Sequence, residues 1–234
     1  MTRVKRLAAP RAWSIPRKTG TWVVRPSPGP HPWSRSIPLT IVLRDMLGYV
    51  DNAREAKAVI RSRKALVDNR TVRDPSFPLG LMDTLSLPDV GEHYRVLVDT
   101  RGRFALVPIK AAEAGWKLAR IENKTVVRGG RIQLNLSDGR NLFAENGHKT
   151  RDTLKIAVPS QEVQEVLPLK KGGVALLIGG KHVGQTGHVE DVVVERGSRA
   201  NQIRFKEGFS SVLAYAFVVG RQKPVVALPE SEAA

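Results

Sequence analysis

The chain has 234 residues, of which 41% are hydrophobic, so it is long enough to bury the cores of two or three small domains. Lysine and arginine outnumber aspartate and glutamate by 38 to 22, and the formal net charge of +16 favours a polyanionic partner, nucleic acid before membrane. Cysteine is absent, which excludes disulfides, thiol catalysis and cysteine-containing zinc sites, and no apolar run suits a membrane helix or a signal core. The cytoplasm is therefore the default location.

Residues 1–36 are rich in proline, and every charged residue before Asp45 is basic. Because the prolines interrupt both helix and sheet, the pattern predicts an extended arm that is disordered until it binds. Tryptophans stand between the cations, and indoles stack on bases while cations meet phosphates. A solubilising tail is the alternative, but such tails are usually poor in aromatic residues. The candidate RNA-binding residues of this arm are Arg3, Lys5, Arg6, Arg11, Trp13, Arg17 and Lys18.

Residues 37–104 carry helix signals followed by a hairpin. Thr40 is expected to cap a helix over 41–47 that Gly48 ends. A second helix is expected over 53–61, where Asn52 is the N-cap and Glu55 completes a capping box. Residues 65–72 are predicted to form a hairpin in which Asn69 takes the left-handed conformation.

One face of this second helix is basic, because Arg54, Lys57 and Arg61 recur at helical spacing. A basic helix followed by a hairpin resembles the S-four-type RNA-binding module, which presents cations to structured RNA. The alternative is a solvated helix face. The candidate RNA-binding residues here are Arg44, Arg54, Lys57, Arg61, Arg63, Lys64 and Arg70.

From residue 85 the hydrophobic pattern alternates with a period of two, which predicts strands. A hairpin is expected from strands 94–99 and 104–107, and its turn supplies Arg101 and Arg103 as further candidate RNA contacts. After a helical turn at 111–114, more strands are predicted at 116–121, 132–136, 142–143 and 153–158. Residues 105–170 are therefore interpreted as a β-rich central domain.

The C-terminal part contains a glycine-rich turn between two apolar runs, 174–178 and 189–194. Gly179 and Gly180 suit positive φ, and Gly184 and Gly187 suit a tight bend or a close approach. The pattern resembles the KOW motif, which begins a small SH3-like barrel that commonly binds RNA or ribosomal proteins. A hairpin without a partner is the alternative. Lys181 and His182 are the candidate contacts, strands at 201–205 and 215–219 are expected to complete the barrel, and the tail from Lys223 is expected to be mobile.

No group of residues predicts catalysis. The five histidines are scattered, with no metal-binding pair at helical spacing, and Asp45, Asp83 and Asp99 lack companions that would form a catalytic site. There is no nucleotide-binding fingerprint either. We therefore predict no enzyme activity, metal, cofactor or small-molecule substrate.

Together these features resemble ribosomal protein S-four-e of the archaeal and eukaryotic small subunit. Short strings carry the resemblance along nearly the whole chain: 5–10 with Trp13, 29–31, 74–75, 80–83, 91–95, 99–104, 218–220 and Pro224. The chain departs from the family at Asn69, where a turn glycine is common, and at 32–34, where more cations are expected. The absence of a long C-terminal extension favours an archaeal type.

The resemblance implies an α+β multidomain fold with four parts. These are a basic proline-rich N-terminal arm at 1–36, an S-four-type RNA-binding module at 37–104, a β-rich central domain at 105–170 and a KOW SH3-like β-barrel with its tail at 171–234. It implies a structural constituent of the small ribosomal subunit in the cytoplasm. Its partners would be small-subunit rRNA and neighbouring ribosomal proteins, not a membrane. Two alternatives remain open, a KOW-containing transcription elongation or RNA-binding factor and an RNA-modifying enzyme with an S-four-type module.

Overall fold

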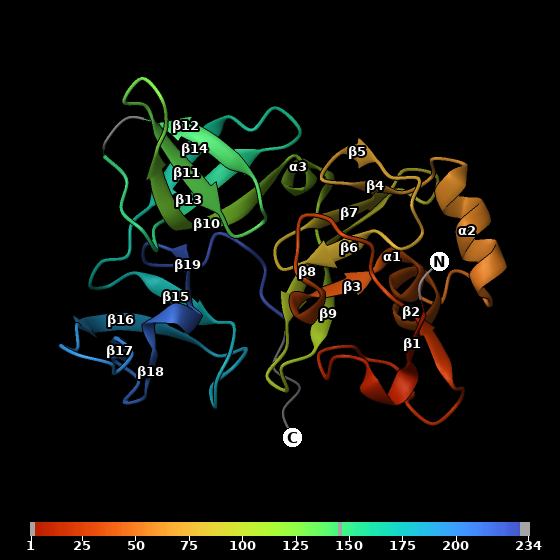
Figure 1. Ribbon diagram of the computed structural model, residues 1–234, viewed down its shortest axis with the longest axis horizontal. Coiled ribbons are helices and arrows are strands. Elements are labelled where there is room, and N and C mark those ends of the chain that lie inside the picture. The colour runs from red at the N-terminus through yellow and green to blue at the C-terminus, as the bar shows by residue number, and fades with distance from the viewer. Residues whose placement is uncertain (1–2, 145–146, 230–234) are drawn as a thin grey trace. The chain divides into compact units, whose positions relative to one another are not determined.

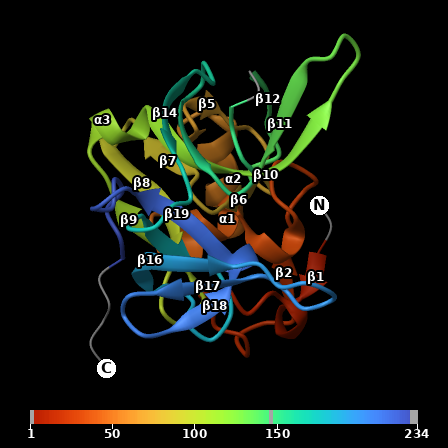
Figure 2. The same ribbon diagram turned by 90° about the vertical axis from the view of Figure 1, so that its left-hand side faces the viewer.

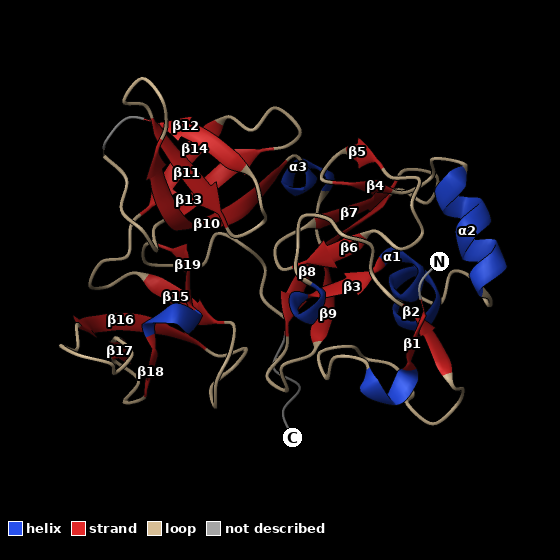
Figure 3. Ribbon diagram, in the orientation of Figure 1, coloured by secondary structure: helices blue, strands red, loops and turns tan. Residues whose placement is uncertain are grey.

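A computed structural model describes residues 3–144 and 147–229 (Figures 1 and 3). The described chain is mostly strand with few helices, which narrows the predicted α+β class to a mostly β structure. It divides into two compact units, the first made of Met1–Leu97 and Arg103–Lys117 and the second of Val98–Gly102 and Leu118–Ala234. The first unit thus extends past the expected boundary at residue 104.

The N-terminal segment, which we define as residues 3–35, is folded, and this corrects the prediction of an extended, disordered arm. It consists of β1 (Arg3–Lys5), η1 (Arg6–Ala8), β2 (Trp22–Val24) and η2 (Trp33–Arg35). β1 pairs antiparallel with β2. The prolines do not prevent this pairing, because both strands are short and proline-free. Trp13 is 2% exposed, and its indole Nε1 donates to the Ser36 carbonyl oxygen at 2.7 Å, so the segment is anchored by burial.

The rest of the first unit is built on one antiparallel sheet in the order β5-β4-β7-β8-β9 and a separate pair, β3-β6. Its strands are β3 (Ser36–Pro38), β4 (Leu66–Val67), β5 (Arg70–Thr71), β6 (Pro78–Gly80), β7 (Thr84–Leu87), β8 (Glu92–Val98) and β9 (Phe104–Pro108). Its helices are α1 (Leu39–Ile41), the π-helical turn η3 (Val42–Met46), α2 (Ala53–Arg61) and α3 (Ala111–Ala114). The predicted helical turn at 111–114 and both predicted hairpins are confirmed.

The helix starts show which local signals decided the structure. Asn52 caps α2 as predicted, since its side chain accepts from the backbone N–H groups of Arg54 and Glu55. Thr40 was the wrong cap for the first helix, because α1 begins at Leu39 and the Thr40 hydroxyl donates to the Pro75 carbonyl at 2.6 Å. In the hairpin turn, Asn69 has φ +57°, which confirms its left-handed conformation.

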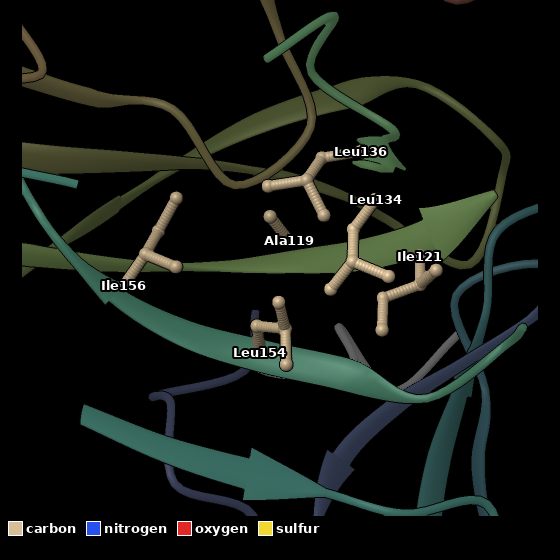
Figure 4. Close-up of a cluster of buried hydrophobic side chains, with 6 residues drawn as sticks. All are labelled: Ala119, Ile121, Leu134, Leu136, Leu154 and Ile156. Carbon is tan, nitrogen blue, oxygen red and sulfur yellow. The ribbon is translucent and has the colours of Figure 1, made fainter. Parts of the chain in front are cut away.

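The second unit contains a five-stranded antiparallel sheet in the order β12-β11-β10-β13-β14. Its strands are β10 (Trp116–Val126), β11 (Ile132–Leu136), β12 (Asn141–Ala144), β13 (Thr153–Ala157) and β14 (Val163–Leu167). Alternate residues of three strands face inward and form one aliphatic cluster (Figure 4): Ala119, Ile121, Leu134, Leu136, Leu154 and Ile156. The predicted strands of the central domain are confirmed, and β14 is an additional strand that the pattern did not indicate.

A second five-stranded sheet follows in the order β18-β17-β16-β15-β19 (Figure 2). Its strands are β15 (Val174–Leu177), β16 (Thr186–Val193), β17 (Gln202–Phe205), β18 (Ser210–Val212) and β19 (Ala216–Gly220), with the turn η4 (Leu213–Tyr215) before β19. In the glycine-rich turn, Gly180 and Gly184 have positive φ, whereas Gly187 does not. Gly187 is required by close approach instead, since a Cβ there would lie 2.7 Å from Cδ1 of Phe205. Val226 is 3% exposed, so the described tail is partly packed.

Candidate nucleic-acid interface

The residues predicted to contact RNA divide into an exposed majority, all of them lysine or arginine, and a minority that is half-buried or buried. The exposed ones are Arg3, Lys5, Arg11, Lys18, Arg54, Arg61, Arg63, Lys64, Arg70, Arg101, Arg103 and Lys181. Half-buried residues are Arg17, Arg44, Lys57 and His182, and fully buried ones are Arg6 and Trp13. The first group defines the candidate interface, because a cation must be exposed to solvent to reach a phosphate.

Two arginines of the N-terminal segment form hydrogen bonds within its loop. Arg6 donates from Nη1 to the Pro16 carbonyl oxygen at 2.8 Å. Arg17 donates from Nη1 to Ala9 and from Nη2 to Pro10, both at 2.8 Å. These bonds tie the two sides of the loop between β1 and β2 together, so the guanidinium groups of Arg6 and Arg17 already have partners within the fold.

The exposed tryptophan of the N-terminal segment is Trp22, whereas Trp13, the predicted aromatic contact, is buried. Trp13 fills the core, so its faces are not accessible to a base. Trp22 is 52% exposed and lies on β2 directly across from Lys5 on β1. Because side chains alternate along a strand, Val23 points inward and leaves Trp22 on the outer face. The sequence signal was available in the alternation of residues 22–24, but the prolines around it led to an arm prediction.

Helix α2 presents the predicted basic face. Arg54 and Arg61 are exposed and Lys57 is half-buried, while Ala56 and Ile60 pack into the core on the opposite side. Helical spacing therefore separates the charged stripe from the buried stripe.

Two other cations of the first unit, Lys64 and Arg44, form ion pairs with carboxylates. Nζ of Lys64 lies 2.7 Å from Oδ2 of Asp89, and Nη2 of Arg44 lies 2.6 Å from Oδ2 of Asp45. Both carboxylates compete with phosphate, so Lys64 and Arg44 are weaker candidates than the cations of α2.

In the second unit, two turns that were predicted separately are in contact. At Gly184 a Cβ would lie 2.3 Å from the carbonyl oxygen of Asp99, so the backbones of the turns meet directly. This contact places the turn that carries Arg101 against the turn that carries Lys181, and both side chains are exposed. The contact joins two turns that are far apart in the sequence.

The histidines beside these turns have partners within the fold. The ring of His182 stacks on Phe209 at 4.9 Å and its Nδ1 bonds to Gln185 Oε1 at 3.0 Å, so packing is its main role. Nδ1 of His188 bonds to Oε1 of Glu207 at 2.9 Å. Partial burial opposes ionisation of Glu207, but hydrogen bonds from the ring and backbone of His188 hold the pKa of Glu207 below its ordinary value.

A buried ionic network, which we define as His31, Asp68, Asp83 and Lys117, lies in the core of the first unit. Nζ of Lys117 is 2.6 Å from Oδ2 of Asp68 and 2.8 Å from Oδ1 of Asp83. Nε2 of His31 is 2.9 Å from Oδ2 of Asp83. Burial opposes ionisation of Asp83, but His31 and Lys117 hold the pKa of its carboxyl well below the ordinary value. The network joins four distant segments, and no local sequence signal indicates it.

The buried ionic network links side chains from separate segments of the first unit. Within residues 3–144 and 147–229, no cluster of three or more His, Asp or Glu side chains is arranged to hold a metal ion. None of the helices in that part of the chain is long and apolar enough to cross a bilayer. The observed chemistry is therefore exposed positive charge on a rigid β framework.

Comparisons with known proteins agree with this description. A model described as the RS4NT (NUC023) domain matches residues 2–34, and one described as Ribosomal family S4e matches residues 90–163. These two matches indicate a ribosomal protein.

Relatives that match over nearly their whole length identify the family of ribosomal protein. Small ribosomal subunit protein eS4 of Methanothermobacter thermautotrophicus is 42% identical over 97% of this chain and 95% of its own length. The protein of the same name from Methanocaldococcus jannaschii is 44% identical over 96% of each chain. The crystal structure of 30S ribosomal protein S4e from Thermoplasma acidophilum superposes with a TM-score of 0.72 and 32% identity, covering 80% of this chain and 95% of that one. The chain belongs to ribosomal family S4e.

Proposed function

We propose that the chain is a structural constituent of the small ribosomal subunit in the cytoplasm, where it binds rRNA and supports subunit assembly and translation. The observation that carries this proposal is the set of exposed cations on folded elements, in a chain that belongs to ribosomal family S4e. Phosphate contacts from such cations supply affinity without requiring a particular base sequence. Neighbouring ribosomal proteins are the other proposed partners.

The finer architecture is part of the same proposal. Residues 37–104 would act as an S-four-type module whose basic α2 and adjoining hairpin face RNA, and residues 1–36 would be a basic N-terminal part that also contacts RNA. Residues 105–170 would form the central domain, and residues 171–234 would form a KOW SH3-like barrel. The contact between the turns at Asp99 and Gly184 supports a shared RNA-facing surface at Arg101 and Lys181.

The two alternatives receive no support of their own. A free elongation factor with a KOW motif does not account for the match at residues 2–34. An RNA-modifying enzyme needs a catalytic site, and Asp83, one of three aspartates that could serve in one, is held by His31 and Lys117 in the buried ionic network.

Co-sedimentation tests the proposed function. The full-length chain, mixed with archaeal small-subunit rRNA and the remaining small-subunit proteins under assembly conditions, is expected to migrate with the assembled particle at moderate salt. Crosslinking followed by sequencing should then recover small-subunit rRNA from the chain. If the chain stays at the top of the gradient while the particle forms without it, the proposal is wrong.

A further inference from the structure

Trp22 is an exposed aromatic ring in a strongly cationic setting. Its side chain is 52% exposed, and no ring contact or hydrogen bond involves it in the part of the chain that the structure describes. The other tryptophans of the N-terminal segment differ, since Trp13 is buried and Trp33 lies 4.5 Å from the guanidinium of Arg25. An exposed indole offers a flat face on which a nucleic-acid base can stack. Trp22 is therefore the ring of this segment that remains available.

A hollow lies beside β1 and β2, on the loop that joins these strands. It has a volume of about 520 Å³ and is lined in part by Lys5, Leu7, Lys18 and Thr21. This volume falls within the usual range for small-ligand sites, about 300–1,000 Å³. Lys5 connects the two features, because it lines the hollow and stands across from Trp22 in the strand register.

The hollow is held open by bonds within its own loop. The Arg6 backbone N–H donates to the Thr21 carbonyl oxygen at 2.9 Å, and the Arg6 guanidinium donates to Pro16. On the other side of the loop, the guanidinium of Arg17 donates to the carbonyl oxygens of Ala9 and Pro10. A site fixed in this way does not have to be ordered when the ligand arrives, which favours binding.

The side chains around the hollow select an anionic ligand. Lys5 and Lys18 are exposed, and neither forms an ion pair with any residue that the structure describes. The sequence before Asp45 contains no carboxylate side chain that could neutralise them. An indole paired with Lys5 across the strands, next to a hollow that Lys5 and Lys18 line, matches a nucleotide, because the ring stacks on the base while the ammonium groups meet phosphates.

We propose that Trp22, Lys5 and Lys18, together with this hollow, bind an unpaired nucleotide of single-stranded RNA. The inference of this Trp22 site rests on the proposed rRNA-binding function. It adds that the RNA bound at the site is single-stranded. The base stacks on the indole of Trp22, and the flanking phosphates lie at Lys5 and Lys18. A base inside a duplex cannot reach the ring, since its faces are covered by neighbouring pairs, so the ligand is a loop, a bulge or a single-stranded end.

Fluorescence anisotropy with the full-length chain tests this site. Two labelled single-stranded RNAs of equal length are needed, a short oligouridylate and the same backbone with abasic nucleotides. Trp22→Ala is expected to weaken oligouridylate binding by about tenfold and to leave the abasic RNA unaffected. Trp22→Phe retains a ring and should bind oligouridylate nearly as well as the parent. Phe143→Ala is the matched control, because Phe143 is 61% exposed on β12 but Arg131 already lies 4.9 Å from its ring centroid.

The outcomes separate this inference from the proposed function. Equal oligouridylate binding by the parent and Trp22→Ala, while both bind small-subunit rRNA, overturns the Trp22 site alone. Equal losses for oligouridylate and abasic RNA also overturn it, because stacking would not be the cause. If Trp22→Ala binds RNA normally but is lost from assembled subunits, the ring contacts a protein and the inference is wrong. Failure of the parent to bind any of these RNAs contradicts the proposed function as well.

Discussion

In the first compact unit, the buried core includes Lys117, which is 1% exposed and lies between the carboxylates of Asp68 and Asp83. In the second unit, the core of the first sheet is an aliphatic cluster that includes Leu154, which is fully buried. Removing one partner of a buried ion pair is strongly destabilising, because it leaves an uncompensated buried charge. The stability of an aliphatic cluster depends mainly on the total volume of its side chains. The first core therefore fixes one arrangement of four distant segments, and the second tolerates repacking.

The largest expected effect tests this contrast by placing the same new side chain in both cores. Lys117→Met removes the ammonium group that lies between the buried carboxylates of Asp68 and Asp83, which should lower the free energy of unfolding by about 3–5 kcal/mol. Leu154→Met conserves volume and polarity and should cost less than about 1.5 kcal/mol. Urea denaturation measures both, with tryptophan fluorescence reporting on the first unit, since all four tryptophans lie in its segments.

Lys110→Met is the surface control, because Lys110 is exposed on the same unit and should change stability by no more than about 0.5 kcal/mol. A Lys117→Met chain as stable as the parent would show that the buried ionic network contributes nothing to the fold. A Leu154→Met chain that loses as much as Lys117→Met would remove the distinction between the two cores.

A smaller effect is expected at Gly187, in the second sheet of the second unit. A Cβ on this residue would lie 2.7 Å from Cδ1 of Phe205 and 3.0 Å from Cζ of Phe209. Gly187→Val should therefore lower the free energy of unfolding by about 1–3 kcal/mol through overpacking. Far-UV circular dichroism during urea unfolding measures the change.

Gly147→Val serves as its control, since no atom lies within 4 Å of a Cβ built there and its φ is not positive. If the two valine variants unfold at the same urea concentration, close approach does not explain the glycine at 187. The second sheet would then tolerate an added side chain as readily as a surface loop does.

Local signals were sufficient where a residue acts on its own neighbours. Asn52 caps α2 through N–H groups two and three residues away, and Asn69 closes a turn between adjacent strands. Both residues were predicted correctly, because the partner lies within the sequence window that a pattern covers. The strands from β8 to β13 were readable for the same reason, since alternation is a local property.

Features that depend on residues far apart in the sequence were not predicted. Trp13 and Trp22 stand in similar basic, proline-rich surroundings, yet Trp13 is buried because Ser36 and its neighbours pack over it. Asp83 receives its partners from residues 31 and 117. The sequence therefore predicted the positive charge of the candidate interface and the basic face of α2. It did not predict which of the cations have partners within the fold. Arg6, Arg17 and Lys64 show this, since each is occupied by a group that local patterns do not identify.

The central claim is that exposed cations on folded elements bind rRNA through its phosphates, and α2 offers the most direct test. Arg54, Lys57 and Arg61 share one face of that helix. In the variant with all three changed to alanine, the slope of log binding constant against log salt should fall in magnitude by roughly 0.7–0.9 for each lost contact. The matched control carries Arg54→Lys and Arg61→Lys and retains Lys57, so it keeps the charge of the face and should keep the slope. Binding of the full-length chain to small-subunit rRNA across a salt series gives both values, and a triple-alanine chain with the parent's affinity and slope would contradict the account.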